Sequence, residues 1–214
     1  MIIAIIGGIG SGKSVTTVKE ILNKNRKCFV NFDIKSNNAV RLKVEHIIKD
    51  DITLTANGKE IHNQSVNWDF WNKEKDKGSF DIYIDEAHNI FNSRRSQTKF
   101  NMLFSLWITQ VRKLFGDKED RDLYLITQRL SALDVVARDL AGKIIYCKKI
   151  MPEATKNVYI IKYTFQGTYC TDKFEAFSCG LTEKADNISF FYANPFFKYY
   201  NSHQLISFGN QVYL

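Results

Sequence analysis

The chain has 214 residues, of which 44% are hydrophobic and 25% are charged, proportions typical of a globular protein with a sizeable core. No apolar run approaches the roughly 20 residues needed to span a bilayer, and the first residues lack the basic flank of a signal peptide, so we expect neither feature. The net charge of +7 favours a polyanionic partner, although lysine- and asparagine-rich proteins are also basic without one.

Apolar runs alternate with helical patterns along the chain. The β-branched run Ile2–Ile6 ends in glycines and predicts a buried parallel strand, and the segment Ser14–Asn23 places its apolar residues on one helical face. Further strands are predicted over Lys27–Ile34, Phe80–Ile84, Asp122–Gln128, Lys143–Ile150 and Val158–Thr164, with a shorter piece over Ile52–Thr55, and helices over Trp68–Glu74 and Phe100–Phe115. This alternation indicates an α/β fold of three layers around a mainly parallel sheet.

The four cysteines argue against a structural zinc site. They show neither C-x-x-C spacing nor a histidine partner pattern. Cys28 and Cys147 lie in apolar runs and are predicted to be small buried hydrophobic residues. Cys170 and Cys179 are near enough in sequence to pair, but nothing indicates an oxidising compartment.

Residues 7–14, GGIGSGKS, match the phosphate-loop pattern G-x-x-x-x-G-K-[ST] directly after a strand and before a helix. Backbone N–H groups of such a loop point at phosphate oxygens, reinforced by the helix dipole. Lys13 is expected to reach the β- and γ-phosphates, and the Ser14 hydroxyl to ligate Mg²⁺. The predicted ATP-binding residues are Gly7, Gly8, Ile9, Gly10, Ser11, Gly12, Lys13, Ser14 and Val15.

The apolar strand over residues 80–84 is followed by two carboxylates, Asp85 and Glu86. Sites of α/β proteins lie at the carboxyl ends of their strands, where these residues fall. We assign Asp85 to Mg²⁺ and Glu86 to the attacking water. Asp81, near the start of the strand, is predicted to be a solvated terminus.

A third polar strand end, Thr127-Gln128, would place an amide between the phosphate loop and the acidic strand. There Gln128 would bond the γ-phosphate or the attacking water; the alternative is an ordinary turn residue. A trans-acting arginine is expected in an oligomeric motor, with Arg112 favoured, Arg129 second and a surface role the alternative. The further candidates are Arg94, Arg95 and Arg138, and the first two, with Lys99, would otherwise face nucleic acid.

Four segments together carry a family resemblance: the phosphate loop, IDEAHNIF (84–91), the arginine-bearing helix and LITQRLSALDVVAR (125–138). They resemble the additional-strand P-loop ATPases of the FtsK–HerA superfamily. Within it, they are most similar to viral genome-packaging ATPases and to the zonular-occludens-toxin-like ATPases of filamentous phages. The resemblance covers residues 1–165, the predicted ATPase core. Residues 166–214 are predicted to be an extension packed on the core or on a neighbouring subunit.

The resemblance implies an ATPase that assembles as a homo-oligomeric ring, often a hexamer, and couples ATP hydrolysis to the movement of DNA. The favoured interpretation is a motor that packages a double-stranded viral genome into a capsid, in the host cytoplasm or virion, with capsid or membrane assembly proteins as partners. A phage assembly or export ATPase is the second interpretation; such relatives usually carry a membrane span. A nucleotide or small-molecule kinase and a non-catalytic nucleotide-gated module are the remaining ones.

Overall fold

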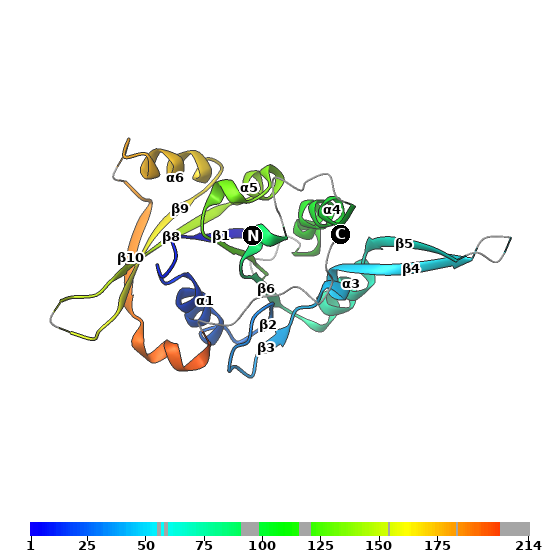
Figure 1. The fold of residues 1–214 in the computed structure, drawn as a ribbon, viewed down its shortest axis with the longest axis horizontal. Coiled ribbons are helices and arrows are strands. Elements are labelled where there is room, and N and C mark those ends of the chain that lie inside the picture. The colour runs from blue at the N-terminus through cyan, green and yellow to red at the C-terminus, as the bar shows by residue number, and fades with distance from the viewer. Residues whose placement is uncertain are drawn as a thin grey trace.

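A computed structural model describes residues 1–54, 57, 60–90, 99–115, 121–153, 155–182 and 184–201. These residues form an eight-stranded central sheet with helices on both faces, and a two-stranded ribbon that projects from one end of the body (Figure 1). The architecture is the three-layer, mainly parallel α/β fold expected from the sequence.

The strands of the central sheet follow the order β10-β9-β8-β1-β7-β6-β2-β3. The parallel strands are β1 (Ile2–Ile6), β2 (Lys27–Val30), β3 (Ala39–Arg41), β6 (Phe80–Ile84), β7 (Leu123–Thr127) and β8 (Lys143–Ile150). The strands β9 (Tyr159–Gln166) and β10 (Asn187–Tyr192) add an antiparallel edge. Because β7 lies between β1 and β6, the sheet has the additional strand that the predicted fold class requires.

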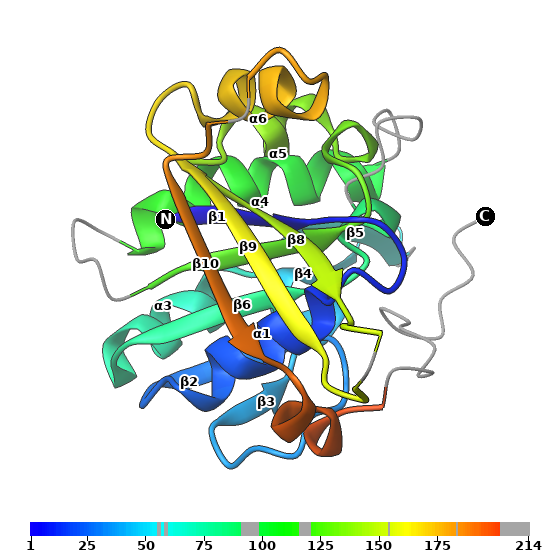
Figure 2. The same ribbon diagram turned by 90° about the vertical axis from the view of Figure 1, so that its left-hand side faces the viewer.

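The helices divide between the two faces of the sheet (Figures 1 and 2). Helix α1 (Lys13–Leu22) covers one face. The other face carries α3 (Trp68–Lys77), α4 (Lys99–Phe115), α5 (Val135–Asp139) and α6 (Cys170–Ser178), while the short α2 (Val44–Ile47) leads into the ribbon. None of these described helices combines the length and the apolar character needed to cross a membrane.

Alternation along β1 shows why the sheet needs both layers. Ile3 and Ile5 pack with Val15 and Val18 of α1, whereas Ile2, Ala4 and Ile6 belong to the cluster on the opposite face, with Phe104 and Trp107 of α4. Successive side chains of a strand point to opposite faces, so a strand with apolar residues at every position must be covered twice. The continuous apolar run of β1 is therefore the signature of its central place.

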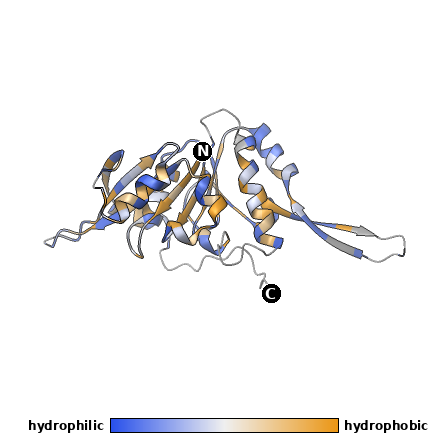
Figure 3. Cartoon of the chain, turned by 90° about the horizontal axis from the view of Figure 1, so that it is seen from above, coloured by the Kyte–Doolittle hydropathy of each residue, from blue (hydrophilic) through white to orange (hydrophobic). Residues whose placement is uncertain are grey.

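The ribbon comprises β4 (Ile48–Leu54) and β5 (Glu60–Val66), which pair antiparallel. Its base is anchored in the core because Ile48 and Val66 are both only 5% exposed. Further out the described residues are mostly polar, and Figure 3 shows this change along the ribbon. The sequence indicated only a strand piece here, and residues 55, 56, 58 and 59 lie outside the described part of the chain.

The carboxyl-terminal residues contribute to the same sheet. After β10, the 3₁₀ segment η4 (Asn194–Tyr199) runs across α1, and Tyr200 forms an isolated antiparallel bridge with Ile34. The strand predicted over residues 27–34 is shorter than expected: β2 ends at Val30, and the Asn31 side chain then bonds the backbone of Asp85. The four cysteines are free thiols, with Cys28 and Cys147 buried as expected.

The expectation of a solvated Asp81 is wrong. Its side chain is fully buried, and its carboxylate accepts hydrogen bonds from the Arg26 Nε (2.8 Å) and from the backbone N–H of Asp122 (2.8 Å). The ammonium group of Lys24 lies 3.2 Å from the same carboxylate. A buried carboxylate needs such partners, and they come from segments that the sequence alone does not place beside it.

Candidate nucleotide-binding site

The loop between β1 and α1 has the backbone conformation that its glycines permit. Gly7, Gly10 and Gly12 have φ angles of 151°, 72° and 96°. A Cβ at Gly7 would lie 2.7 Å from the carbonyl oxygen of Cys147, and one at Gly12 would lie 2.2 Å from the Ile160 Cδ1. Both outer glycines of the motif are therefore required by close neighbours as well as by backbone conformation.

Lys13 lies inside the loop. Its ammonium group donates to the carbonyl oxygens of Gly7 (2.9 Å) and Gly8 (3.1 Å), and the residue is only 8% exposed. These two carbonyl oxygens occupy the hydrogen-bonding positions around the Lys13 ammonium group that phosphate oxygens would take in the presence of a nucleotide. The first turn of α1, which begins at Lys13, offers the N–H groups and the helix dipole that favour an anion.

Asp85 follows β6 and faces the start of α1. The Ser14 Oγ lies 3.5 Å from the Asp85 Oδ2, and the backbone N–H and C=O of Asp85 are both bonded by the Asn31 side chain, at 2.7 and 2.9 Å. Burial raises the pKa of the Asp85 carboxyl group to about 6, although the N–H of Glu86 and Lys13 favour its charged form. Asn31 thus fixes the position of a carboxylate that has no direct salt bridge among the described contacts.

The donor set formed by Ser14 and Asp85 fits Mg²⁺. A hydroxyl and a buried carboxylate, aimed at one point beside the phosphate loop, are the hard oxygen ligands that this ion takes together with water and phosphate oxygens. The pair would hold the ion at the side of the loop nearest β6.

Glu86 has a left-handed backbone conformation, with φ 50° and ψ 43°, and is the non-glycine residue with positive φ in the described chain. Such strain persists only where surrounding structure imposes it, and it is concentrated at functional sites. The conformation turns the chain from β6 into the 3₁₀ segment η1 (Ala87–Asn89) and leaves the Glu86 side chain partly exposed.

A histidine connects Glu86 with the neighbouring strand. The His88 Nδ1 lies 3.3 Å from the Glu86 Oε2 and 3.2 Å from the hydroxyl oxygen of Thr127, at the end of β7. Gln128 follows β7 directly and is half-exposed, and β7 lies between β1 and β6. Its contact with the γ-phosphate or the attacking water stays a prediction. The sequence analysis did not assign Asn31, His88 or Thr127 to the site. Each is a polar residue at or soon after the end of an apolar strand, and this position is the signal that could have identified it.

The arginine candidates occupy different places. Arg129 is exposed, just beyond β7. Arg138 lies on α5, and its Nε is buried without a described hydrogen bond. Arg112 lies near the end of α4, which leads toward the amino ends of the strands, where the backbone carbonyl of Arg121 bonds the Met1 amino group. The side chain of Arg112 lies outside the described part of the structure, and so do Arg94 and Arg95. A role in trans for Arg112 or Arg129 stays a prediction.

A cavity of about 450 Å³ adjoins the loop. Its wall includes six loop and helix residues from Ile9 to Val15, and it continues along β8, β9 and the carboxyl-terminal segment. The volume lies within the range of small-molecule sites. The cavity therefore adjoins the phosphate loop and the start of α1, whereas Asp85 and Glu86, which follow β6, are not among the residues that line it.

The sequence profile of the family described as zonular occludens toxin (Zot) matches residues 1–203. The chain belongs to the Zot family. This match includes the loop, both acidic residues and most of the predicted extension, and it agrees with the resemblance stated from the motifs. No curated protein matches the chain.

Among solved structures, the chain is similar to the N-terminal domain of zonular occludens toxin from Neisseria meningitidis, with a TM-score of 0.53, 17% identity, and coverage of 94% of this chain and 98% of that one. It also matches the genome packaging NTPase B204 of Sulfolobus turreted icosahedral virus 2 in complex with ATP-gammaS, with a TM-score of 0.45, 16% identity, and coverage of 91% and 93%. At 17% identity, the similarity to the first of these structures supports a shared P-loop fold and no more.

Proposed function

We propose that this Zot-family chain hydrolyses ATP and uses the energy to move viral DNA during particle assembly. The observation that supports hydrolysis most directly is the placement of Glu86, beside Asp85 and the phosphate loop, in a strained conformation with a hydrogen-bonding contact to His88. A kinase needs no carboxylate there, and a non-catalytic binding module needs neither Glu86 nor its strain.

The residues divide the reaction between them. Lys13 exchanges its bonds to Gly7 and Gly8 for contacts with the β- and γ-phosphates, and the loop N–H groups hold the remaining oxygens. Ser14 and Asp85 would hold Mg²⁺, which would supply the charge neutralisation that phosphoryl transfer needs.

Glu86 then accepts a proton from the water that attacks the γ-phosphate, acting as a general base. His88 and Thr127 orient Glu86 and connect it to β7. Gln128, which follows Thr127, would bond the γ-phosphate or the attacking water directly.

Two uses of the hydrolysis energy are open to such a site. The net charge of +7 supports a DNA substrate, because phosphate contacts need lysine and arginine, and DNA movement into a capsid is the use that we favour. Membership of the Zot family supports phage assembly or export as the second use. In either case we expect the site to be completed in an oligomeric ring, by an arginine of the next subunit.

The test is ATP turnover with and without double-stranded DNA, at low and at moderate salt. A DNA motor should show several-fold stimulation that falls with salt, because the contacts release counterions. Lys13→Ala serves as the control and should abolish nucleotide binding. Turnover indifferent to DNA would contradict DNA movement and favour the assembly ATPase; absence of Lys13-dependent turnover would contradict hydrolysis itself.

A further inference from the structure

The 3₁₀ segment η4, which follows β10, packs against α1, the helix that follows the phosphate loop. Phe196 and Tyr199, three residues apart, pack against the core cluster that contains Val15 and Val18 of α1. Phe197 and Tyr200, also three residues apart, line the cavity beside the phosphate loop. A 3₁₀ helix has three residues per turn, so Phe196 and Tyr199 share the face of η4 that holds it on the protein, and Phe197 lies on the next face. Tyr200 follows η4 in an extended conformation, where it both packs against the same cluster and lines the cavity.

This segment is fixed at both ends. At its start, the backbone N–H of Ala193 donates to the Val158 carbonyl (2.8 Å) and the Val158 N–H donates to the Asn194 side chain (2.8 Å). At its end, the N–H of Lys35 donates to the Tyr199 carbonyl (2.8 Å). The aromatic rings are therefore held in place before a ligand arrives, which lowers the entropic cost of binding to them.

The order of the strands gives the direction in which a nucleotide would lie. The two acids follow β6, on one side of β1, so the γ-phosphate end points to that side. The base end must extend to the other side, toward β8 and β9. There the cavity is walled by Lys149, Val158 and Ile160, and η4 begins beside Val158.

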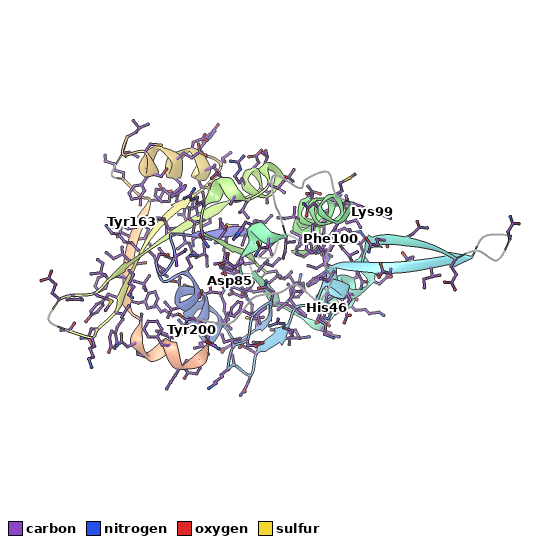
Figure 4. The ribbon with its side chains drawn as sticks, in the orientation of Figure 1. His46, Asp85, Lys99, Phe100, Tyr163 and Tyr200 are labelled. Carbon is purple, nitrogen blue, oxygen red and sulfur yellow. The ribbon has the colours of Figure 1, made fainter. Side chains whose placement is uncertain are left out.

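The two rings take different positions along this line. Phe197 lies within η4, the segment that begins beside Val158. Tyr200, directly after η4, pairs with Ile34, beyond the end of β2, and lies toward Asp85 (Figure 4). The ring centroids of Phe197 and Tyr200 are 6.4 Å apart and their planes are tilted by 39°. Phe197, which is 41% exposed, is thus a large apolar ring open to the space where the base would lie.

We propose that the carboxyl-terminal 3₁₀ segment and the residue that follows it bind the nucleoside half of the nucleotide: Phe197 stacks on the base, and Tyr200 lies against the ribose, closer to the phosphates. Every base has a π-face, so stacking on an aromatic ring needs no particular base edge. The inference rests on the nucleotide-binding function proposed above and assigns part of that function to the sequence beyond residue 165.

The test compares the affinities of two ligands for the Phe197→Ala variant with their affinities for the unaltered chain. Binding of Mg-ATP and of Mg-tripolyphosphate is measured by calorimetry on the full chain. ATP affinity should fall by about 5- to 100-fold, the range of one base–aromatic stack, while tripolyphosphate affinity stays unchanged because it lacks a base. Phe197→Trp should restore ATP binding.

A matched control is Phe190→Ala, which removes the same side chain from β10, where it is 76% exposed and outside the cavity wall. It should leave both affinities unchanged. Wild-type ATP affinity in Phe197→Ala, or an equal loss for both ligands, would overturn the proposal while leaving the phosphate site intact. Failure of the unaltered chain to bind either ligand would instead overturn the proposed function, and this inference with it.

Discussion

Strand β6 carries a carboxylate near each end, and the protein surrounds the two in opposite ways. At the amino end, Asp81 is bonded by Arg26 and contacts Lys24, so its charge is met by cations within the fold. At the carboxyl end, Asp85 is held by Asn31 through its backbone, and its carboxylate has hydrogen-bonding contacts with the Ser14 hydroxyl and the N–H of Glu86 among the described residues. Burial raises the pKa of both groups, and at Asp81 the two cations oppose the shift.

The difference distinguishes a structural acid from a functional one. A buried carboxylate whose partners belong to the chain is already satisfied and joins elements together. A carboxylate that is buried beside a phosphate loop, and whose oxygens lack a full set of partners within the chain, can bind an external cation. The two ends of the strand should therefore respond differently to substitution: one in activity, the other in stability.

The largest effect is expected at the carboxyl end. Glu86→Gln removes the general base but keeps the size of the side chain, so ATP turnover should fall by about 10²- to 10⁴-fold. Nucleotide affinity and the free energy of unfolding should change little, because the Glu86 side chain is partly exposed and its described contact is with the half-exposed His88. Steady-state turnover, calorimetry and urea unfolding measure the three quantities. Turnover equal to that of the unaltered chain would remove Glu86 from the mechanism.

The next effect is expected at the amino end. Asp81→Asn places an amide donor against the guanidinium of Arg26 and removes the nearer of the two carboxylates beside Lys24, the other being Asp122 at 3.7 Å. The free energy of unfolding should fall by about 2 kcal/mol. Turnover below the unfolding transition should remain within about twofold, since no atom of Asp81 approaches the loop. Urea unfolding and the turnover assay are the measurements. A loss of activity without a loss of stability would contradict the division of roles along β6.

The smallest effect concerns Glu74 of α3, at the same edge as Asp81. Burial alone would raise its pKa, but hydrogen bonds from Lys27 and Lys77, both at 2.6 Å, lower it below the usual 4.5. A lowered folded-state pKa stabilises the fold above pH 4.5, and this contribution disappears as the pH falls through the folded-state value.

Glu74→Gln should thus reduce stability at pH 7 by less than about 1 kcal/mol, because both lysines are exposed enough to be screened. The difference between the variant and the unaltered chain should vanish in unfolding experiments at acidic pH and shrink in high salt. A difference that persists below the folded-state pKa would show that packing, and not charge, accounts for the role of Glu74.

The sequence predicts those parts of the site that lie in short contiguous motifs. The loop from Gly7 to Ser14 and the pair Asp85 and Glu86 are recognisable because each follows an apolar strand, and the carboxyl ends of parallel strands meet at one edge. The place of β7 between β1 and β6 is what the resemblance to additional-strand ATPases implies. These predictions depend on local pattern and on one rule of topology.

What the sequence could not predict depends on contacts between distant segments. Asp81 has the same local pattern as a solvated strand end, and only the packing of Arg26 and Asp122 against it makes it a buried group. Likewise, nothing in the aromatic stretch from Phe190 to Tyr200 separates core residues from cavity-lining ones. That distinction appears only when η4 is seen to cross α1.

The central position of β1 has a consequence for how the protein folds as it is synthesised. Ile2 pairs with Leu123, and Ile3 with Lys143, so the strand that carries the phosphate loop is flanked by partners made some 120 to 140 residues later. Closing such long loops is slow and leaves apolar strands exposed meanwhile. A nascent chain therefore cannot assemble its nucleotide site until most of it has left the ribosome, and during that time Ile2–Ile6 would be a target for chaperones.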